Sequence, residues 1–372
     1  MLPESLKHAP STKRPTIALV RVFSTTGVIA LFLALSTSVA VSAEPATLNT
    51  GPEIGQPVPH FEAIDQKGVK QTLDTLRGPK GLLLLFTRSA DWCPFCKGHL
   101  VQLERQREGF ESRGYRIAAL TYDTPEVLSH FAERAEINYP LLSDPDSKII
   151  RAFDILNKTI PESHPFYGIP NPGQYLIDAD GRVEAKFFEE KYSDRFTPGN
   201  ILVQTLGGPG SGPHTEIRTK HLRAVTSASD TVVRGGNRVA LVLEVDLDPK
   251  MHVYAPGVEE YIPIDWKMND ATGVTSFPAA CPDSELLHLP AIDEIVPVYS
   301  GRFRVVMEVL LGKPDELTTD INGDLVVSGA FRYQACDDKL CYLPEEVPLE
   351  WRFQLEAHDR TRVPKPLRRG TE

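Results

Sequence analysis

Two pairs of cysteines are the residues of this chain with the most evident chemistry. Cys93 and Cys96 lie in the segment Trp-Cys-Pro-Phe-Cys-Lys with two residues between them, and Cys336 and Cys341 have four residues between them. A thiolate of such a pair can attack a disulfide bond in another molecule, and the second thiol can then close a disulfide and release that molecule. Close cysteine pairs indicate either thiol–disulfide exchange or structural disulfide bonds, and their surroundings must decide between the two.

The surroundings of Cys93 and Cys96 favour redox chemistry. The run Gly-Leu-Leu-Leu-Leu-Phe-Thr at 81–87 precedes the pair and predicts a strand that is buried on both faces. Apolar residues then recur at helical spacing over 100–110, so we expect the pair at the N-terminus of a helix. Unpaired N–H groups there, together with the positive charge of Lys97, would stabilise a thiolate.

Two other interpretations of this first pair are weaker. A disulfide between Cys93 and Cys96 would close a loop too short to stabilise the fold much. A zinc site would need two further ligands close by, and His99 supplies one at most. The 10 histidines show no His-x-x-x-His or similar spacing, so no metal and no cofactor is assigned.

The segment 51–196, which contains this pair, has the pattern of an α/β domain. A second apolar strand is expected at 116–122, and Thr124 followed by proline marks the start of a helix. Two further strands, at 174–177 and 182–188, flank an Asp-Ala-Asp-Gly turn that is typical of a hairpin. Strands that alternate with helices predict a sheet with helices on both faces.

A different pattern follows a linker predicted at 197–214, where the Gly- and Pro-rich segment Thr-Leu-Gly-Gly-Pro-Gly-Ser-Gly-Pro occurs. Apolar residues then alternate with polar ones in three stretches, at 239–247, 303–311 and 347–355. This alternation is typical of half-buried strands, so we expect residues 215–357 to form an all-β sandwich. The polar and basic tail at 358–372 is expected to be disordered.

Residues 51–196 resemble the thioredoxin-fold redoxin group, which contains peroxiredoxins and thiol–disulfide reductases. The resemblance rests on the Trp-Cys-Pro-Phe-Cys-Lys motif after an apolar strand, on Asn-Tyr-Pro-Leu-Leu-Ser-Asp-Pro-Asp and on Pro-Asn-Pro-Gly-Gln-Tyr-Leu-Ile-Asp-Ala-Asp-Gly-Arg-Val. It implies a thioredoxin-like α/β fold and a cis-proline that faces the cysteine pair and shapes its groove. Pro172 stands at that position, with Pro170 as the second choice.

This resemblance leaves two reactions open. In dithiol exchange, Cys93 would be the nucleophile and Cys96 would resolve the mixed disulfide. In peroxide reduction the roles would be reversed, because Cys93 stands where peroxiredoxins carry a Thr or Ser before the peroxidatic cysteine, and Arg88 would supply a cation. The carboxylate that thioredoxins bury beneath the pair has no counterpart in the apolar strand. Asp91 lies beside the motif instead, so the proton acceptor is unassigned.

Cys336 and Cys341 are expected in the turn of a β-hairpin, where a disulfide is a common structural staple. Residues 215–357 also resemble the N-terminal domain of the transmembrane thiol:disulfide interchange reductase, on the segments Tyr-Gln-Ala-Cys-Asp-Asp-Lys-Leu-Cys-Tyr-Leu-Pro and Met-His-Val-Tyr-Ala-Pro-Gly. That domain is an immunoglobulin-like sandwich with a redox-active pair on a hairpin. The resemblance implies that Cys341 is the attacked sulfur and that an aromatic residue caps the disulfide, for which Tyr299 is the candidate.

The first 43 residues have the order of a secretory signal peptide. Basic residues come first, an apolar run at 27–41 follows, and Val-Ser-Ala supplies a cleavage site. We therefore expect a periplasmic or otherwise exported protein without stable membrane insertion after cleavage; a retained anchor is the alternative, although the run is shorter than a spanning helix needs. All 5 cysteines follow this segment. Cys281, which has no local partner, is expected to be a half-buried thiol that packs as a small hydrophobic side chain.

Together these observations predict an exported thiol–disulfide oxidoreductase whose partners are proteins with thiols or disulfides. In its fuller form, electrons would pass between the two cysteine pairs. One alternative is a peroxiredoxin-like thiol peroxidase, an antioxidant enzyme with peroxide as its substrate. Another is a non-enzymatic periplasmic adaptor in which the bond between Cys336 and Cys341 is structural. The net charge of -10 argues against a nucleic-acid partner.

Overall fold

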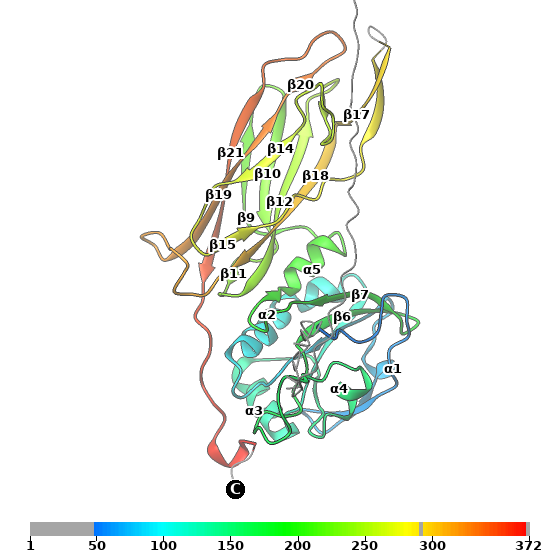
Figure 1. Ribbon diagram of the computed structural model, residues 1–372, viewed down its shortest axis with the longest axis vertical. Coiled ribbons are helices and arrows are strands. Elements are labelled where there is room, and N and C mark those ends of the chain that lie inside the picture. The colour runs from blue at the N-terminus through cyan, green and yellow to red at the C-terminus, as the bar shows by residue number, and fades with distance from the viewer. Residues whose placement is uncertain (1–47, 290–292, 370–372) are drawn as a thin grey trace, which may run out of the picture. The chain divides into compact units, whose positions relative to one another are not determined.

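A mixed sheet with helices on both faces forms the first part of the chain, and β-sheets form the second part (Figure 1). The structure is a computed structural model that describes residues 48–289 and 293–369. The signal peptide predicted at 1–43 lies outside the described residues. Within the described ranges, no helix is long and apolar enough to cross a membrane. Residues from Thr47 onward belong to one unit, so contacts between the two parts are contacts within a single body.

One sheet organises the first part. Its strands are β1 (Glu62–Asp65), β2 (Lys70–Thr72), β3 (Gly81–Phe86), β4 (Tyr115–Thr121), β5 (Leu141–Ser143), β6 (Gly173–Asp178) and β7 (Val183–Phe188). The strand order is β2-β1-β5-β4-β3-β6-β7, and β3 pairs in parallel with β4 and antiparallel with β6. All 6 residues of β3 are buried, which confirms the strand predicted from the apolar run.

Helices cover both faces of this sheet, as predicted. They are α1 (Leu73–Leu76), α2 (Pro94–Glu111), α3 (Pro125–Ala135), α4 (Lys148–Ala152) and α5 (Pro198–Gln204). Successive residues of a strand face opposite sides of a sheet. Leu84 of β3 accordingly shares one core with Ile149 of α4, and its neighbour Leu85 shares another core with Leu100 of α2. The cysteine motif follows β3, an interior strand of this sheet, and enters α2.

The linker predicted at 197–214 is wrong over most of its length, because helix α5 and strand β9 (Ser211–Arg218) occupy it. The Thr197 side chain caps α5 and a proline follows it, a combination that begins a helix. Val203 of α5 is buried against the second part of the chain. Apolar residues before the Gly-rich stretch thus fold into the structure.

The second part is an all-β sandwich, as predicted. Its further strands are β8 (Arg195–Phe196), β10 (Leu222–Ala228), β11 (Val232–Val233), β12 (Asn237–Leu247), β13 (His252–Tyr254), β14 (Asp265–Met268), β15 (Val274–Ser276), β16 (Glu285–Leu289), β17 (Glu294–Ser300), β18 (Arg302–Leu311), β19 (Asp324–Tyr333), β20 (Ala335–Cys336) and β21 (Glu345–Leu355). The two main sheets have the orders β15-β18-β12-β10-β9 and β11-β21-β19-β14. Leu243 of β12 and Val327 of β19 share the core between them. A smaller sheet has the order β16-β17-β13-β20.

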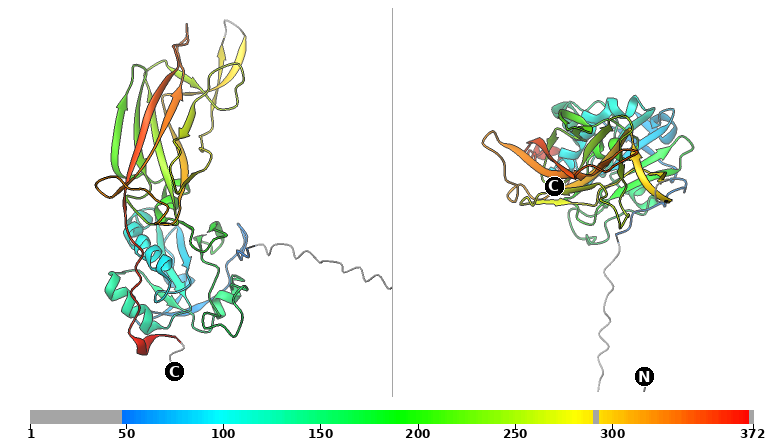
Figure 2. Two further views of the ribbon diagram at one scale, coloured as in Figure 1. Left: turned by 60° about the vertical axis from the view of Figure 1, so that its left-hand side comes forward. Right: turned by 90° about the horizontal axis from the view of Figure 1, so that it is seen from above.

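The tail predicted to be disordered at 358–372 is ordered as far as residue 369, where the description ends. We call residues 356–369 the C-terminal strap. In Figures 1 and 2 this red segment leaves β21 and runs along α2 and α3. It ends in a short 3-10 helix, Lys365–Leu367. The expectation was wrong because the strap buries Val363, which is 3% exposed, and forms ion pairs with residues far away in the sequence.

Candidate functional site

The first cysteine pair lies at the N-terminus of α2, as predicted. Cys93 is the N-cap residue, Pro94 occupies the first turn, and the Cys96 backbone N–H donates to the Cys93 Sγ over 3.3 Å. The two cysteines form a disulfide bond, and they are only 1% and 0% exposed. When the bond is reduced, the N–H groups of this helix end are placed to stabilise a thiolate at Cys93.

Aromatic side chains flank the motif and hold Arg88. Trp92 stacks on Phe166 with ring centroids 4.1 Å apart, and its indole N–H donates to the Tyr122 hydroxyl. The Arg88 guanidinium lies 4.8 Å from the Trp92 ring centroid and 4.1 Å from that of Tyr192. Burial lowers the pKa of Arg88. The cation expected beside the motif is therefore present, and it is bound by aromatic rings.

Phe95, the residue between Pro94 and Cys96, connects the motif with other segments. Its ring centroid is 5.9 Å from that of Tyr192 and 4.3 Å from that of His358 in the C-terminal strap. A Cβ atom placed on Gly236 would lie 3.7 Å from Phe95 Cδ1. The loop before β12 and the strap therefore both reach the residue that lies between the two cysteines.

Asp123 is a buried carboxylate beside the motif that the sequence did not reveal. It follows β4, and it accepts hydrogen bonds from the Ser89 hydroxyl (3.0 Å) and the Ala90 backbone N–H (2.7 Å). Burial raises the pKa of Asp123 from 3.8 to about 6, and Asp91 contributes in the same direction. Its position directly after the second apolar strand was the available signal, because parallel neighbouring strands end at one edge of the sheet.

Asp91 also lies beside the motif, and the strap supplies its partners. Arg362 donates to both carboxylate oxygens, over 2.8 Å and 2.5 Å, and the Val363 backbone N–H donates over 2.8 Å. The hydrogen bonds to Asp91 raise the pKa of Arg362. A cavity of about 370 Å³ beside Trp92 is lined by Asp91, Arg362 and the aromatic Phe166, among others. The strap thus forms one wall of a cavity next to the cysteine motif.

Lys97 and His99 of α2 are both buried and have different surroundings. The Lys97 ammonium donates to the Thr361 carbonyl oxygen (2.6 Å) and lies 3.6 Å from Asp359, so a second strap segment contacts the motif. Burial lowers the pKa of Lys97. Burial also lowers the pKa of His99 to about 3, so its ring is neutral at physiological pH. Within the described residues, no cluster of three or more His, Cys, Asp or Glu is arranged to hold a metal ion.

Pro172 is buried directly before β6, which pairs with the strand that leads into the cysteine motif. Its peptide bond is trans, as are all those in the described ranges, so the cis bond expected at Pro172 or Pro170 is wrong. The backbone before Pro172 is extended because residues 170–171 pair with residues 155–156. Leu156 forms a β-bridge with Pro170, and the Asn171 N–H donates to the Ile155 carbonyl over 2.7 Å.

The second cysteine pair forms a disulfide bond between residues of unequal exposure. Cys336 in β20 is 1% exposed, whereas Cys341 is exposed to solvent. The turn between them is fixed by Asp337, whose carboxylate accepts two backbone N–H groups and the Tyr342 hydroxyl. These hydrogen bonds lower the pKa of Asp337. An incoming thiolate can reach the sulfur of Cys341 more easily than that of Cys336.

Tyr254, not Tyr299, is the aromatic residue at this disulfide. The Tyr254 hydroxyl lies 3.6 Å from the Cys341 Sγ, and its ring stacks on Tyr261 with centroids 4.3 Å apart. Tyr299 instead packs on Phe303 in the main core, with centroids 4.8 Å apart. The prediction failed because Tyr299 lies on the face of β17 opposite to Val298, which packs with Cys336.

Both parts of the chain match known families. Residues 54–186 match the model of the AhpC/TSA family, and residues 220–349 match that of the thiol:disulfide interchange protein DsbD, N-terminal. The chain therefore contains a segment similar to the AhpC/TSA family and a segment similar to the N-terminal part of DsbD. We call these segments the redoxin domain and the DsbD N-terminal domain. Each matched range contains one of the two cysteine pairs, so the resemblances expected from the sequence are confirmed for both.

Several relatives match the redoxin domain. Peroxiredoxin Bcp of Escherichia coli (strain K12) is 29% identical over 140 residues, 38% of this chain and 88% of the relative. Thiol-disulfide oxidoreductase ResA of Bacillus cereus (strain ZK / E33L) is 27% identical over 144 residues, 38% of this chain and 74% of the relative. The solved structure of peroxidoxin BcpB from Mycobacterium tuberculosis has a TM-score of 0.34 at 23% identity, and covers 38% of this chain and 88% of that chain. The chain is an enzyme of the oxidoreductase class.

The redoxin pair and the DsbD-domain pair lie near opposite ends of β12. At the start of this strand, Asn237 pairs with Arg195 of β8 and accepts a hydrogen bond from Gln102 of α2 over 2.6 Å. Beyond its other end, His252 of β13 pairs with Cys336. At about 3.3 Å per residue, the 11 residues of β12 span about 35 Å. The two disulfides are therefore too far apart for direct exchange within one chain in this arrangement.

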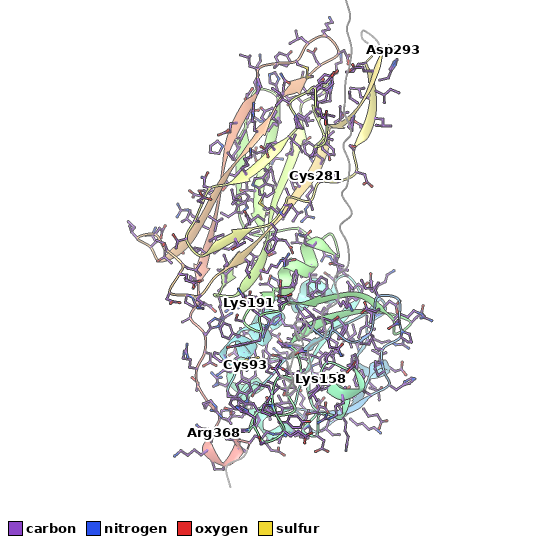
Figure 3. All side chains as sticks on the ribbon, viewed as in Figure 1. Cys93, Lys158, Lys191, Cys281, Asp293 and Arg368 are labelled. Atoms are coloured by element: carbon purple, nitrogen blue, oxygen red, sulfur yellow. A yellow bond between two sulfur atoms is a disulfide. The ribbon has the colours of Figure 1, made fainter. Side chains whose placement is uncertain are left out.

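Exposed apolar side chains lie near the second pair. Leu340 and Leu343, next to Cys341 in the sequence, are 52% and 87% exposed. Leu286 and Ile295 of the β16–β17 hairpin are also exposed, but they lie on the face of that hairpin opposite to Val296 and Leu287, which pack with Cys336. Asp293, labelled in Figure 3, lies beside the tip of that hairpin. Apolar clusters on a protein surface commonly mark contact sites for another protein.

Cys281 is a free, half-buried thiol, as predicted, and it packs against the main core of the DsbD N-terminal domain (Figure 3). Burial raises the pKa of its thiol. A thiol with a raised pKa is largely protonated near neutral pH and therefore a poor nucleophile. Cys281 is accordingly a packing residue.

Proposed function

We propose that this chain is an exported thiol–disulfide oxidoreductase that works by dithiol–disulfide exchange at Cys93 and Cys96. The observation that carries the proposal is the position of Cys93 as the N-cap of α2, where its sulfur accepts the Cys96 backbone N–H. A negatively charged sulfur at this position gains from that hydrogen bond and from the partial positive charge of the helix end.

Dithiol–disulfide exchange needs no cofactor, because the two thiols of the enzyme supply both electrons. In the reduced enzyme the Cys93 thiolate attacks one sulfur of a partner disulfide, which forms a mixed disulfide and releases one partner thiolate. The Cys96 thiol then loses its proton and attacks the Cys93 sulfur. The products are the bond between Cys93 and Cys96 and a partner with two thiols, so two electrons have moved to the partner. The oxidised state seen here is the product of that half-reaction.

The second pair is proposed to exchange with a separate protein. Exposed Cys341 is the sulfur that a partner thiolate would attack, and buried Cys336 would then be the leaving group. The exposed Leu340 and Leu343 supply apolar surface for the partner at the same place. Because about 35 Å of β12 separates the two pairs, a relay between them runs through another molecule or a second copy of the chain.

Export is part of this proposal. The signal-like order of residues 1–43 supports it. Fractionation of cells that produce the full-length chain tests it. A protein that stays in the cytosol at its full length would exclude this part of the proposal.

Reduction of insulin, followed by its precipitation, tests the main reaction. The reduced enzyme should accelerate it, and Cys93→Ser should abolish the acceleration. The double variant Cys336→Ser/Cys341→Ser should keep most of it, because insulin meets the redoxin pair directly, and Cys281→Ser is the matched control for loss of a thiol. Full activity of Cys93→Ser would exclude Cys93 as the nucleophile.

Thiol peroxidase activity is the second candidate, and the relatives named peroxiredoxin favour it. Here the Cys96 thiolate would attack hydrogen peroxide, release water and become a sulfenic acid, which Cys93 would convert to a disulfide with release of a second water. Stopped-flow measurements with hydrogen peroxide separate the reactions. A peroxidase would keep its first turnover in Cys93→Ser and lose it in Cys96→Ser, whereas rates no faster than a free thiol exclude this activity.

The adaptor hypothesis concerns the second pair alone. A bond between Cys336 and Cys341 that serves only the fold should have a reduction potential below about −300 mV. The exposure of Cys341 and the contact of its sulfur with Tyr254 favour a reactive bond instead. Equilibration of the Cys93→Ser/Cys96→Ser variant with glutathione buffers measures this potential directly.

A further inference from the structure

The C-terminal strap binds the loop that carries the cysteine motif, although the two are distant in sequence. Arg362 and Asp91 are separated by 271 residues and form a bidentate ion pair. The adjacent Thr361 carbonyl accepts a hydrogen bond from Lys97, the residue that follows Cys96. Side chains on both sides of the cysteine pair are thus held by consecutive residues of the strap.

Asp91 is the centre of this contact. Its side chain is 4% exposed, and its carboxylate accepts hydrogen bonds from the Arg362 guanidinium and from the Val363 backbone N–H. Its own backbone N–H donates to the Ser89 hydroxyl. A buried carboxylate with no cation nearby is costly, and Arg362 supplies the cation that pairs with Asp91.

The charge of Asp91 matters for the thiols because Cys93 follows it by two residues. Two residues of extended chain span about 7 Å at most. That figure is the largest separation of the Cα atoms of the two residues. A negative charge on a side chain so close in the sequence disfavours a second one nearby, which would raise the pKa of the Cys93 thiol. A guanidinium bound to both carboxylate oxygens removes most of that effect, since the pair is neutral overall.

We propose that the C-terminal strap is part of the redoxin active site, with Arg362 as a positioning residue that neutralises Asp91 and so allows a thiolate to form at Cys93. This inference rests on the proposed function, in which Cys93 is the nucleophile. It gives the DsbD N-terminal domain, from whose last strand the strap continues, a direct part in the reactivity of the redoxin pair.

Other ionisable groups face the motif, and they enter the titration of Cys93 as well. On the elements packed around it they are Arg88, Lys97, Tyr122, Asp123, Tyr192 and Asp359. His358 also lies against Phe95. The variants of Asp91 and Arg362 leave all of these groups in place. A difference in the alkylation midpoint between those variants therefore reports the ion pair of Asp91 and Arg362.

The test is the pH dependence of alkylation of Cys93 in the reduced full-length chain. Cys96→Ser isolates the thiol, and mass spectrometry of the Cys93 peptide after iodoacetamide treatment gives the rate at each pH. In this background, Arg362→Gln should raise the midpoint of the profile by about one pH unit. Arg362→Lys should keep most of the parent value, because it restores the charge. Arg360→Gln, an exposed arginine of the same strap, is the matched control and should leave the midpoint unchanged.

A double variant separates charge from structure. If Arg362 acts by neutralising Asp91, then Asp91→Asn/Arg362→Gln should return the midpoint to near the parent value. A loosened strap changes the access and solvation of Cys93 in the single and the double variant alike, so it would not return the midpoint to the parent value in Asp91→Asn/Arg362→Gln. The inference is overturned if Arg362→Gln leaves the midpoint in place, or if its shift persists in the Asp91→Asn background. Alkylation needs no redox partner, so failure of the insulin assay alone would overturn the proposed function and leave this result standing.

Discussion

Asp123 and Asp91 are connected through Ser89, yet they have different partners. Asp123 accepts hydrogen bonds from neutral groups in the motif loop, whereas Asp91 binds a guanidinium. Burial without a bound cation explains why the pKa of Asp123 rises to about 6. A buried acid with such a pKa binds its proton more tightly in the folded state than in the unfolded chain.

The raised pKa of Asp123 predicts that the free energy of unfolding depends on pH. Because the folded pKa of Asp123 is raised, its ionisation costs folding free energy as pH rises from about 4 to about 6, by about 3 kcal/mol in all. In Asp123→Asn that loss should be absent, so the stability of wild type relative to the variant should fall over this range. Urea denaturation at several pH values measures it. The exposed Asp154 has a lowered pKa, so wild type relative to Asp154→Asn should show no such fall.

The unequal exposure of the second pair gives another prediction. After reduction, Cys341 should react with iodoacetamide at least about tenfold faster than Cys336, because only Cys341 reaches solvent. Peptide mass spectrometry after brief labelling gives the ratio. Equal rates would show that the hairpin opens in the reduced state, so that exposure to solvent does not make Cys341 the more reactive of the two thiols.

The sequence singled out the two close cysteine pairs, both of which form disulfide bonds, but it did not reveal the side chains that surround them. Short-range patterns reveal a helix start after a strand, which placed Cys93 correctly. The partners of the motif come from far along the chain: Asp123 bonds to a residue 33 positions away, and Arg362 to one 271 positions away. No local pattern encodes such contacts, because tertiary packing brings them together.

The loop before β12 is where elements of the two domains meet. Gly236 has a φ of +84°, and a Cβ atom there would lie 2.2 Å from the Ser193 carbonyl oxygen. The same Cβ atom would lie 3.7 Å from Phe95 Cδ1 of the motif. Only glycine allows the backbones to approach this closely.

A matched pair of glycine substitutions tests this close approach. Gly236→Ala and Gly257→Ala both place alanine at a positive φ, which costs about 1–2 kcal/mol. Only Gly236→Ala also creates a backbone clash, since a Cβ atom on Gly257 meets nothing within 4 Å. Gly236→Ala should therefore reduce the free energy of unfolding by about 1 kcal/mol or more beyond Gly257→Ala. Guanidinium denaturation followed by tryptophan fluorescence compares them, and equal losses would contradict the contact.

Elements with a strong periodic pattern could be predicted, and those held by distant contacts could not. The apolar run of β3 and the alternation of β12 and β21 matched the structure. Helix α5 was missed because the Gly-rich stretch that follows it led to the prediction of a linker over the whole segment 197–214. The strap was missed because a polar segment lacks an apolar period, and its order comes from ion pairs to the other domain.

At the scale of the whole molecule, the positions of the two pairs restrict how electrons can move between them. The redoxin motif lies near the start of β12 and the DsbD-domain pair beyond its end. Linkage of two redox sites in one chain raises their effective concentration only if both can be engaged together. In this structure each pair is placed to meet a different molecule.

A chain that retains only Cys93 and Cys341 tests this restriction. In Cys96→Ser/Cys281→Ser/Cys336→Ser, oxidation with diamide should give dimers linked from Cys93 to Cys341, with a yield that rises with protein concentration. Non-reducing electrophoresis and peptide mass spectrometry identify the bond. A monomer with an internal bond at all concentrations would show that the domains separate in solution.

The strap also has a consequence for how the enzyme matures. The ribosome makes Asp91 271 residues before Arg362, which at roughly 5–20 residues per second is an interval of roughly 15–55 seconds. During that interval no arginine is present at the carboxylate beside Cys93. If Arg362 acts as proposed, Cys93 gains its full nucleophilicity only after Arg362 has been made and the strap has docked on Asp91.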